Sequence, residues 1–117
     1  MSLTKQTQNQ EIHMTTLNTT GLTKAATCFL KAVEALEQVS LIKIVGQPQF
    51  GQPVAGDADY KSASRNYEAA AQAFHDAGLA YAACDFEAGA RLEKKAGRKL
   101  GSAERLYRRG YRACCGR

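Results

Sequence analysis

The sequence contains no tryptophan, only two prolines and two histidines, and no long apolar segment. No run approaches the roughly 18 consecutive apolar residues that a membrane-spanning helix requires, so no membrane span is expected. The N-terminus is polar and lacks an apolar core segment, so we expect no secretory signal peptide. The four cysteines are therefore predicted to be reduced thiols in a cytoplasmic protein.

Groupings of residues that carry catalysis or bind metals are also scarce. The cysteines form no CxxC pair, and the repeated Gly-Gln-Pro of residues 46–53 lacks the lysine of a phosphate-binding loop. His75 precedes Asp76, but neighbours in a helix point to different sides. The adjacent Cys114 and Cys115 leave two alternatives open, oxidation between chains and binding of a soft metal. We predict a protein that is not an enzyme and has no catalytic, cofactor-binding or metal-binding residues.

The apolar residues that are present follow a helical period. The 117 residues suit one domain, and 44% hydrophobic content argues against disorder throughout. Apolar residues recur every three or four positions over 22–45, over 57–84 and from Phe86 to just before Gly116. We predict an all-α fold, an antiparallel bundle of three long helices in a single domain over residues 20–117. Residues 1–19, rich in Thr, Gln and Asn, are predicted to be a flexible tail.

The predicted inward faces contain many small residues. On the first helix they are Leu22, Ala25, Ala26, Phe29, Val33, Leu36, Val39 and Ile42; on the second Tyr60, Ala63, Tyr67, Ala70, Ala71, Phe74, Ala77, Gly78 and Tyr81; on the third Gly89, Leu92 at the edge, Ala96, Leu100, Ala103, Tyr107, Tyr111 and Cys114. A break near Gly101 and Ser102 is the alternative to one long third helix, because glycine costs about 1 kcal/mol in a helix and serine caps well. Alanine and glycine bury little area, so a homodimer that supplies further burial is a second expectation.

The connections between the helices carry their own signals. Residues 46–57 are predicted to be a loop, because Gly46-Gln47-Pro48 recurs as Gly51-Gln52-Pro53. Its length leaves open a mobile connector or a binding loop. Asp57 or Asp59 is expected to cap the second helix, and Asp85 to lie at the turn into the third.

Residues 74–92 resemble one hairpin of the tetratricopeptide family. The resemblance rests on Gly78, Tyr81, the Asp85-Phe86 turn and Gly89. The turn is one residue shorter than in that family, and no second repeat is present, whereas such arrays need about three. We interpret it as a shared way of packing two helices; membership would imply peptide binding by a concave surface.

The charge of +5 is distributed unevenly. Residues 91–117 contain ten basic and two acidic residues, a net charge of +8, whereas the first 90 residues carry −3. Most of the cations share one face of the predicted third helix, opposite Leu100 and Tyr107. These candidate binding residues are Arg91, Lys94, Arg98, Arg105, Arg108, Arg109 and Arg112.

Such a row of cations predicts an acidic partner. The primary hypothesis is an interaction protein of the adaptor or inhibitor type that binds an acidic protein surface. The alternative is a nucleic-acid-binding protein, since a row of about 32 Å at 1.5 Å per residue spans several phosphates. A solvated helix face is the structural alternative. Tyr107 and Tyr111 lie between the arginines, where stacking on bases and packing in the core are both open, with packing favoured.

Overall fold

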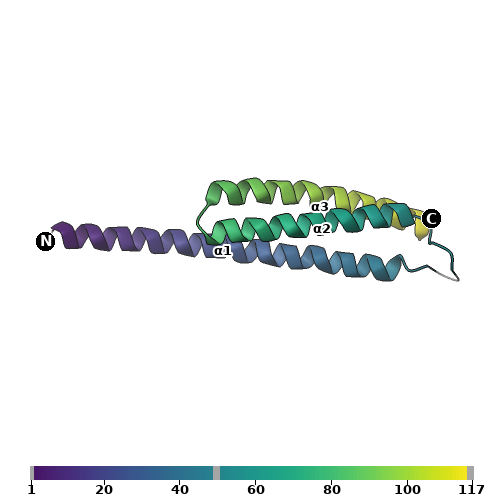
Figure 1. Ribbon diagram of the computed structural model, residues 1–117, viewed down its shortest axis with the longest axis horizontal. Helices are drawn as coiled ribbons and strands as arrows, with labels where there is room; N and C mark the ends of the chain where they lie inside the picture. Colours follow the sequence, from purple (N-terminus) through teal and green to yellow (C-terminus); the bar gives the residue numbers. More distant parts are fainter. Residues whose placement is uncertain (1, 49–50, 116–117) are drawn as a thin grey trace.

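The computed structural model describes residues 2–48 and 51–115, with side chains from Asn18 onward in these ranges. It contains three helices, α1 (Ser2–Val45), α2 (Asp57–Ala82) and α3 (Phe86–Cys114). Figure 1 shows α1 and α3 each running antiparallel to α2, which confirms the predicted three-helix bundle. The molecule is a rod of 79 × 20 × 19 Å. No described helix is long and apolar enough to cross a bilayer.

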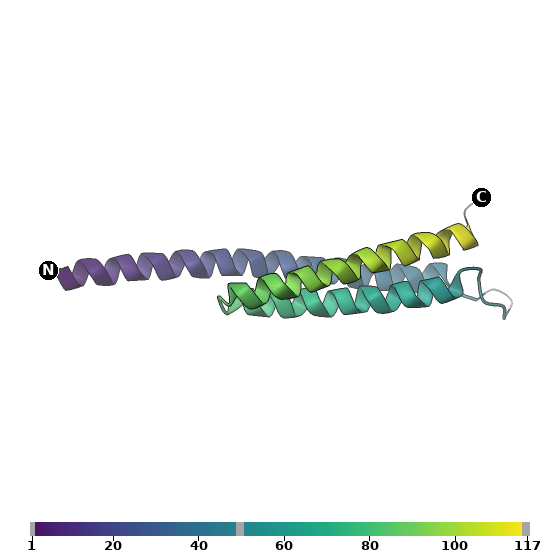
Figure 2. The ribbon, with the colours of Figure 1, turned by 90° about the horizontal axis from the view of Figure 1, so that it is seen from above.

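Helix α2 lies between the other two helices and carries most of the core. It packs along both α1 and α3, whereas α1 and α3 make few contacts with each other. Figure 2 shows from above that the three helices run side by side along the bundle, with α3 in front. Every residue predicted for its inward face is buried. Aromatic side chains recur on this face every seven residues, at Tyr60, Tyr67, Phe74 and Tyr81, with alanines between them.

Small residues of α3 face these aromatic rings. The buried residues of α3 are also spaced by seven: Gly89, Ala96, Ala103 and Gly110. A Cβ atom on Gly89 would lie 2.7 Å from the Tyr81 ring, and one on Gly110 would lie 2.9 Å from the Tyr60 ring. In both pairs the glycine therefore packs directly against the ring, with no room for a side chain between them.

The residues between these two end pairs of the α2–α3 interface follow the same register. Because both sets of residues repeat every seven positions, two further pairs follow: Ala96 with Phe74, and Ala103 with Tyr67. All four side chains belong to one buried cluster. We call this series of four pairs the aromatic–small ladder.

Helix α1 turns a different face to the bundle from the one predicted. Its buried side chains are mostly small: Ala25, Cys28, Ala32, Ala35, Val39 and Ile42. The prediction is right for Ala25, Val39 and Ile42. It is wrong for the exposed Ala26 and for Leu22, Val33 and Leu36, each of which is more than half exposed. The reason is the close approach of α1 to α2, which favours small side chains along much of the contact. At Gly21, for example, a Cβ atom would collide with the Tyr81 carbonyl oxygen.

The first helix is also longer than predicted, since it begins at Ser2 and not at Leu22. Once a helix is nucleated, each further residue adds a hydrogen bond at low cost, so a polar segment can continue it. Contacts with the bundle start near the predicted end of the tail, where the Cys84 thiol donates to Asn18 Oδ1 at 3.2 Å. Figure 1 shows the earlier part of α1 projecting beyond the other helices. Its flexibility stays a prediction.

The structure confirms one of the predicted helix caps and corrects the other. Asp85 caps α3, because its carboxylate accepts a hydrogen bond from the Ala88 backbone N–H at 3.1 Å. Helix α2 begins at Asp57, as predicted, but neither aspartate caps it, since Gly56 occupies the cap in a left-handed conformation, at φ 83°. Helix α3 continues through Gly101 without the alternative break.

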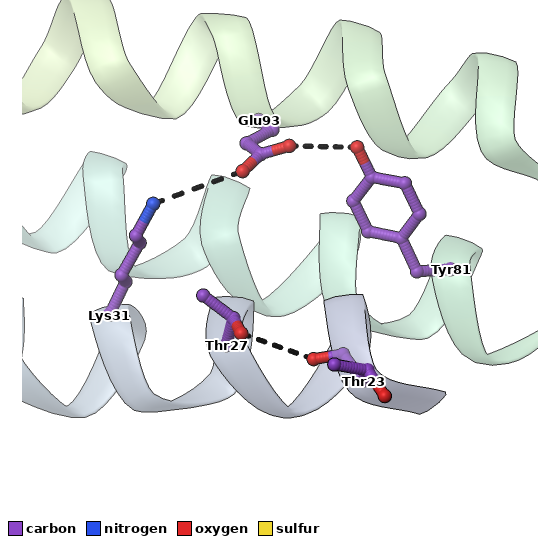
Figure 3. A network of polar contacts seen from close by, with 5 residues as sticks. All are labelled: Thr23, Thr27, Lys31, Tyr81 and Glu93. Atoms are coloured by element: carbon purple, nitrogen blue, oxygen red, sulfur yellow. Dashed lines mark hydrogen bonds and ion pairs between the residues drawn. The ribbon is translucent and has the colours of Figure 1, made fainter. Parts of the chain in front are cut away.

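One polar network links all three helices (Figure 3). The Tyr81 hydroxyl of α2 donates to Glu93 Oε1 of α3 at 2.7 Å, and Glu93 Oε2 lies 3.9 Å from Lys31 Nζ of α1. Burial first, and then the hydrogen bond to Glu93, raises the pKa of Tyr81 to about 12. The network holds α1 and α3 in register at a place where they make little other contact.

The ladder predicts opposite effects for two glycines of α3. Gly89→Ala should lower the free energy of unfolding by about 1 kcal/mol or more, because overpacking exceeds the gain in helix propensity. Gly97→Ala should raise it by up to about 1 kcal/mol, since a Cβ atom at Gly97 has no neighbour within 4 Å. Urea unfolding followed by circular dichroism measures both. Equal stabilisation by the two alanines would contradict the ladder.

Two tyrosines of α2 form a second matched pair. Tyr60 Oη is buried, and no described residue offers it a hydrogen bond of good geometry. Tyr60→Phe should therefore be neutral or stabilising at pH 7, whereas Tyr81→Phe, which removes the bond to Glu93, should cost about 1 kcal/mol. Urea unfolding at pH 7 separates the two.

The same tyrosines predict a loss of stability at alkaline pH. Burial is the main cause that raises the pKa of Tyr60 to about 12, as it does for Tyr81, while unfolded tyrosine ionises near 10. Between these values the unfolded chain has released protons that the fold retains, so the free energy of unfolding falls as pH rises from about 10 to 12. The fall should be less steep in Tyr60→Phe.

Candidate functional site

The seven predicted binding residues form one exposed surface on α3, which we call the basic face. All seven side chains are exposed: Arg91, Lys94, Arg98, Arg105, Arg108, Arg109 and Arg112. They lie away from the buried glycines and alanines that pack on α2. Because those small residues hold the helix tightly against α2, the basic face is presented on a fixed backbone.

One cation of the basic face is bound by the chain itself. Arg109 Nη2 donates to Asp59 Oδ1 of α2 at 2.7 Å, while the arginine side chain stays 70% exposed. The hydrogen bond from Arg109 lowers the pKa of Asp59, and the same bond raises that of Arg109. The pair brings one carboxylate of a neighbouring helix onto the basic face.

A second acidic group makes only a loose contact. Glu104 Oε2 lies 3.9 Å from Arg108 Nη2, one turn along the same helix. No other described carboxylate lies within ion-pairing distance of the remaining five members of the basic face. Most of this positive charge is therefore open to a partner.

Four arginines surround a shallow groove near the end of α3. The groove measures about 500 Å³ and is lined by Ser102, Arg105, Leu106, Arg108, Arg109 and Arg112. The side chain of Leu106 is half-buried, and Arg105 Nη2 donates to Ser102 Oγ at 3.3 Å. The groove thus combines an apolar residue with guanidinium groups, which bind carboxylates or phosphates through paired donors.

The two tyrosines among these arginines differ in their surroundings. Tyr107 is half-buried, and its ring centroid lies 5.8 Å from that of Tyr60, which favours the core-packing interpretation. Tyr111 stacks on Tyr107 at 6.3 Å but is 48% exposed. The sequence pattern placed Tyr111 on the inward face and missed this exposure, because the last turns of α3 extend past the core residues of α2.

Two of the thiols have raised pKa values. Cys28 is buried, and burial is the main cause that raises its pKa. Cys115 Sγ donates to Cys114 Sγ at 3.1 Å, and this hydrogen bond raises the pKa of Cys115. In the described part of the chain no cysteine forms a disulfide.

His75 has no acid–base partner of the catalytic kind. It is exposed and packs its ring 5.5 Å from Phe29, while Asp76 accepts a hydrogen bond from Gln72 at 3.0 Å. Among the residues with described side chains, no group of three or more His, Cys, Asp or Glu is arranged to hold a metal ion.

Comparisons with protein-family models, with curated proteins and with solved structures give no match to this chain. Residues 74–92 do form a helix–turn–helix hairpin, in which Gly89 packs on Tyr81 as the tetratricopeptide resemblance suggests. No tetratricopeptide model is matched, so the resemblance describes packing alone.

Proposed function

We propose that this protein is a non-enzymatic interaction protein that binds an acidic macromolecular partner through the basic face of α3. The observation that carries the proposal is the row of seven exposed cations on one helix, of which two lie near a carboxylate of the described chain. Electrostatic attraction of this kind steers association and selects partners of opposite charge. An acidic protein surface is the partner that we favour.

Two features of the groove support a protein partner. The Arg109–Asp59 pair has the geometry in which a helix side chain receives a carboxylate from a neighbouring helix. Leu106 and the exposed Tyr111 add apolar contact area beside the arginines. Aromatic residues and arginine are enriched in protein–protein interfaces.

The second candidate function is nucleic-acid binding. It is favoured by the spread of the cations from Arg91 to Arg112, about 32 Å of helix at 1.5 Å per residue, all on one face. Contacts with several phosphates would make the affinity fall steeply with salt. The described residues offer no arrangement that would distinguish one base from another, so such binding would not depend on the base sequence.

Two further parts of the proposal concern setting and assembly. The cysteines form no disulfide among the described residues, which supports a reducing, cytoplasmic setting. The alanine-rich core supports a homodimer, because it leaves larger apolar residues of α1 outside the bundle.

Charge reversal tests the basic face directly. Arg98→Glu combined with Arg105→Glu should weaken binding of a fluorescent polyglutamate peptide at least about tenfold, because it replaces attraction by repulsion at the contact. Lys61→Glu combined with Arg65→Glu on α2 is the matched control, since it changes the net charge equally at exposed positions. Fluorescence anisotropy at about 50 and 200 mM salt measures the affinities.

The outcomes of this experiment separate the two candidates. Peptide binding that only the α3 variant weakens supports the proposal. Binding to duplex DNA but not to the peptide would favour nucleic-acid binding. If neither probe binds at low salt, or if both double variants weaken binding equally, the basic face is not a binding site.

Removal of the internal carboxylate should strengthen binding. Asp59→Asn frees Arg109, so the affinity for the polyglutamate peptide should rise several-fold at low salt. Asp57→Asn is the control with the same change in charge, since Asp57 pairs with Lys61 on α2 at 3.0 Å. An equal increase in both variants would show that net charge, and not the release of Arg109, is responsible.

A further inference from the structure

Helix α1 carries a second apolar surface that no part of the described chain covers. Its large apolar side chains are between 42% and 68% exposed: Leu22, Leu30, Val33, Leu36, Leu41 and Ile44. They lie on one side of the helix, next to the small residues that face α2, and we call this surface the outer face. Glu37 is the one charged residue among them.

A groove extends the outer face onto α2. It measures about 440 Å³ and is lined by Phe29, Ala32, Val33 and Leu36 of α1, and by Glu68, Ala71, Gln72 and His75 of α2. Leu79, 53% exposed, lies one helical turn beyond His75 on the same side of α2. No residue of α3 lines this groove, so the outer face and the basic face are separate surfaces.

We propose that a second copy of this chain covers the outer face, with the two α1 helices antiparallel across a two-fold axis at Val33. A two-fold contact requires a surface that is complementary to itself, so that residue i meets j and residue j meets i. With Val33 at the axis, the numbers of any two residues that face each other across the contact add up to 66.

Five of the six exposed apolar residues of α1 satisfy this pairing, while Leu41, the least exposed of them, lies opposite the buried Ala25. Leu22 meets Ile44 of the second copy, Leu30 meets Leu36, and Val33 meets itself. These five residues are all at least half exposed. Every contact in the series therefore joins two large apolar side chains that are in water in the single chain.

A parallel pairing fits less well. Each residue of α1 would then face its own copy, and Glu37 would lie against a second Glu37 inside the contact. In the antiparallel pairing Glu37 lies opposite position 29, where Phe29 is half-buried against α2. The two like charges are then held apart on opposite sides of the axis.

The size of the surface also suits a dimer. The exposed apolar residues of α1 together with Leu79 offer on the order of 600 Å² per copy, at the upper end for patches on single chains and near the about 800 Å² per partner of a standard interface. A nucleic acid would gain nothing from a surface whose acidic groups are Glu37 and Glu68, so a second apolar helix is the matching occupant.

Self-association of the full chain provides the first test. Analytical ultracentrifugation from about 1 to about 100 μM should show a dimer in the range typical of interfaces of this size. Val33→Glu should weaken dimerisation at least about tenfold, because two carboxylates are brought together at the axis. Thr27→Glu, an exposed position on another side of α1, should leave it unchanged. Circular dichroism confirms that both variants are folded.

A charge pair tests the register. Leu30→Glu alone should weaken the dimer, and Leu30→Glu combined with Leu36→Lys should recover affinity at least about tenfold, because each new carboxylate then faces a new ammonium group. Leu30→Glu combined with Leu36→Glu is the control, and should be weaker than the single variant. In a parallel dimer the first combination would place like charges opposite each other.

Three results would overturn the proposal. The wild-type chain could be monomeric at about 100 μM, a concentration at which an interface of standard size associates. Val33→Glu and Thr27→Glu could have the same effect on dimerisation. The Leu30→Glu and Leu36→Lys combination could fail to recover affinity over Leu30→Glu alone.

Discussion

The structure depends on one steric constraint, the aromatic–small ladder between α2 and α3. Four rings on α2, seven residues apart, meet two glycines and two alanines on α3 at the same spacing. A ring buries a large area, and it does so fully only where the opposing backbone comes close enough to cover it. Glycine and alanine permit that approach, so a core with few large aliphatic side chains still excludes water. Larger residues are not tolerated at these positions, because a single added methyl group at Gly89 or Gly110 would collide with a ring.

Close packing on small residues also determines what the other surfaces contain. Close approach of backbones recurs between α1 and α2, where α1 presents Gly21, Ala25 and Cys28 inward and its leucines lie outside. On α3 the inward positions are taken by small residues, so the long charged side chains lie on the opposite side. The basic face and the outer face are thus both consequences of the same kind of packing, although they lie on different helices and have opposite chemical character.

The sequence predicted the three helices and all of the inward face of α2 except Ala73, because there the aromatic residues that set the helical period are the buried ones. It failed for α1, where hydrophobicity ranks Leu36 above Ala35 although the space available admits only the alanine. The basic residues were predicted to share a face, since that depends on the period of one helix alone. Their partner Asp59 was not predicted, because its contact with Arg109 depends on the register between two helices. The small residues of α1 recur along the sequence at alternating steps of four and three. That spacing indicates the buried side of the helix, although the more hydrophobic leucines favour a different side.

If the two proposed surfaces act together, their placement has a functional consequence. A two-fold dimer through α1 carries two basic faces, one on the α3 of each copy, with neither used in the dimer contact. An extended acidic partner that reaches both would bind the second face at an effective concentration set by the distance between them, so its overall affinity would exceed that of either face by orders of magnitude. A weak, salt-sensitive contact on a single helix would then become selective for partners that carry two acidic segments. The stability of the dimer would in this way control the strength of binding without any change at the basic face.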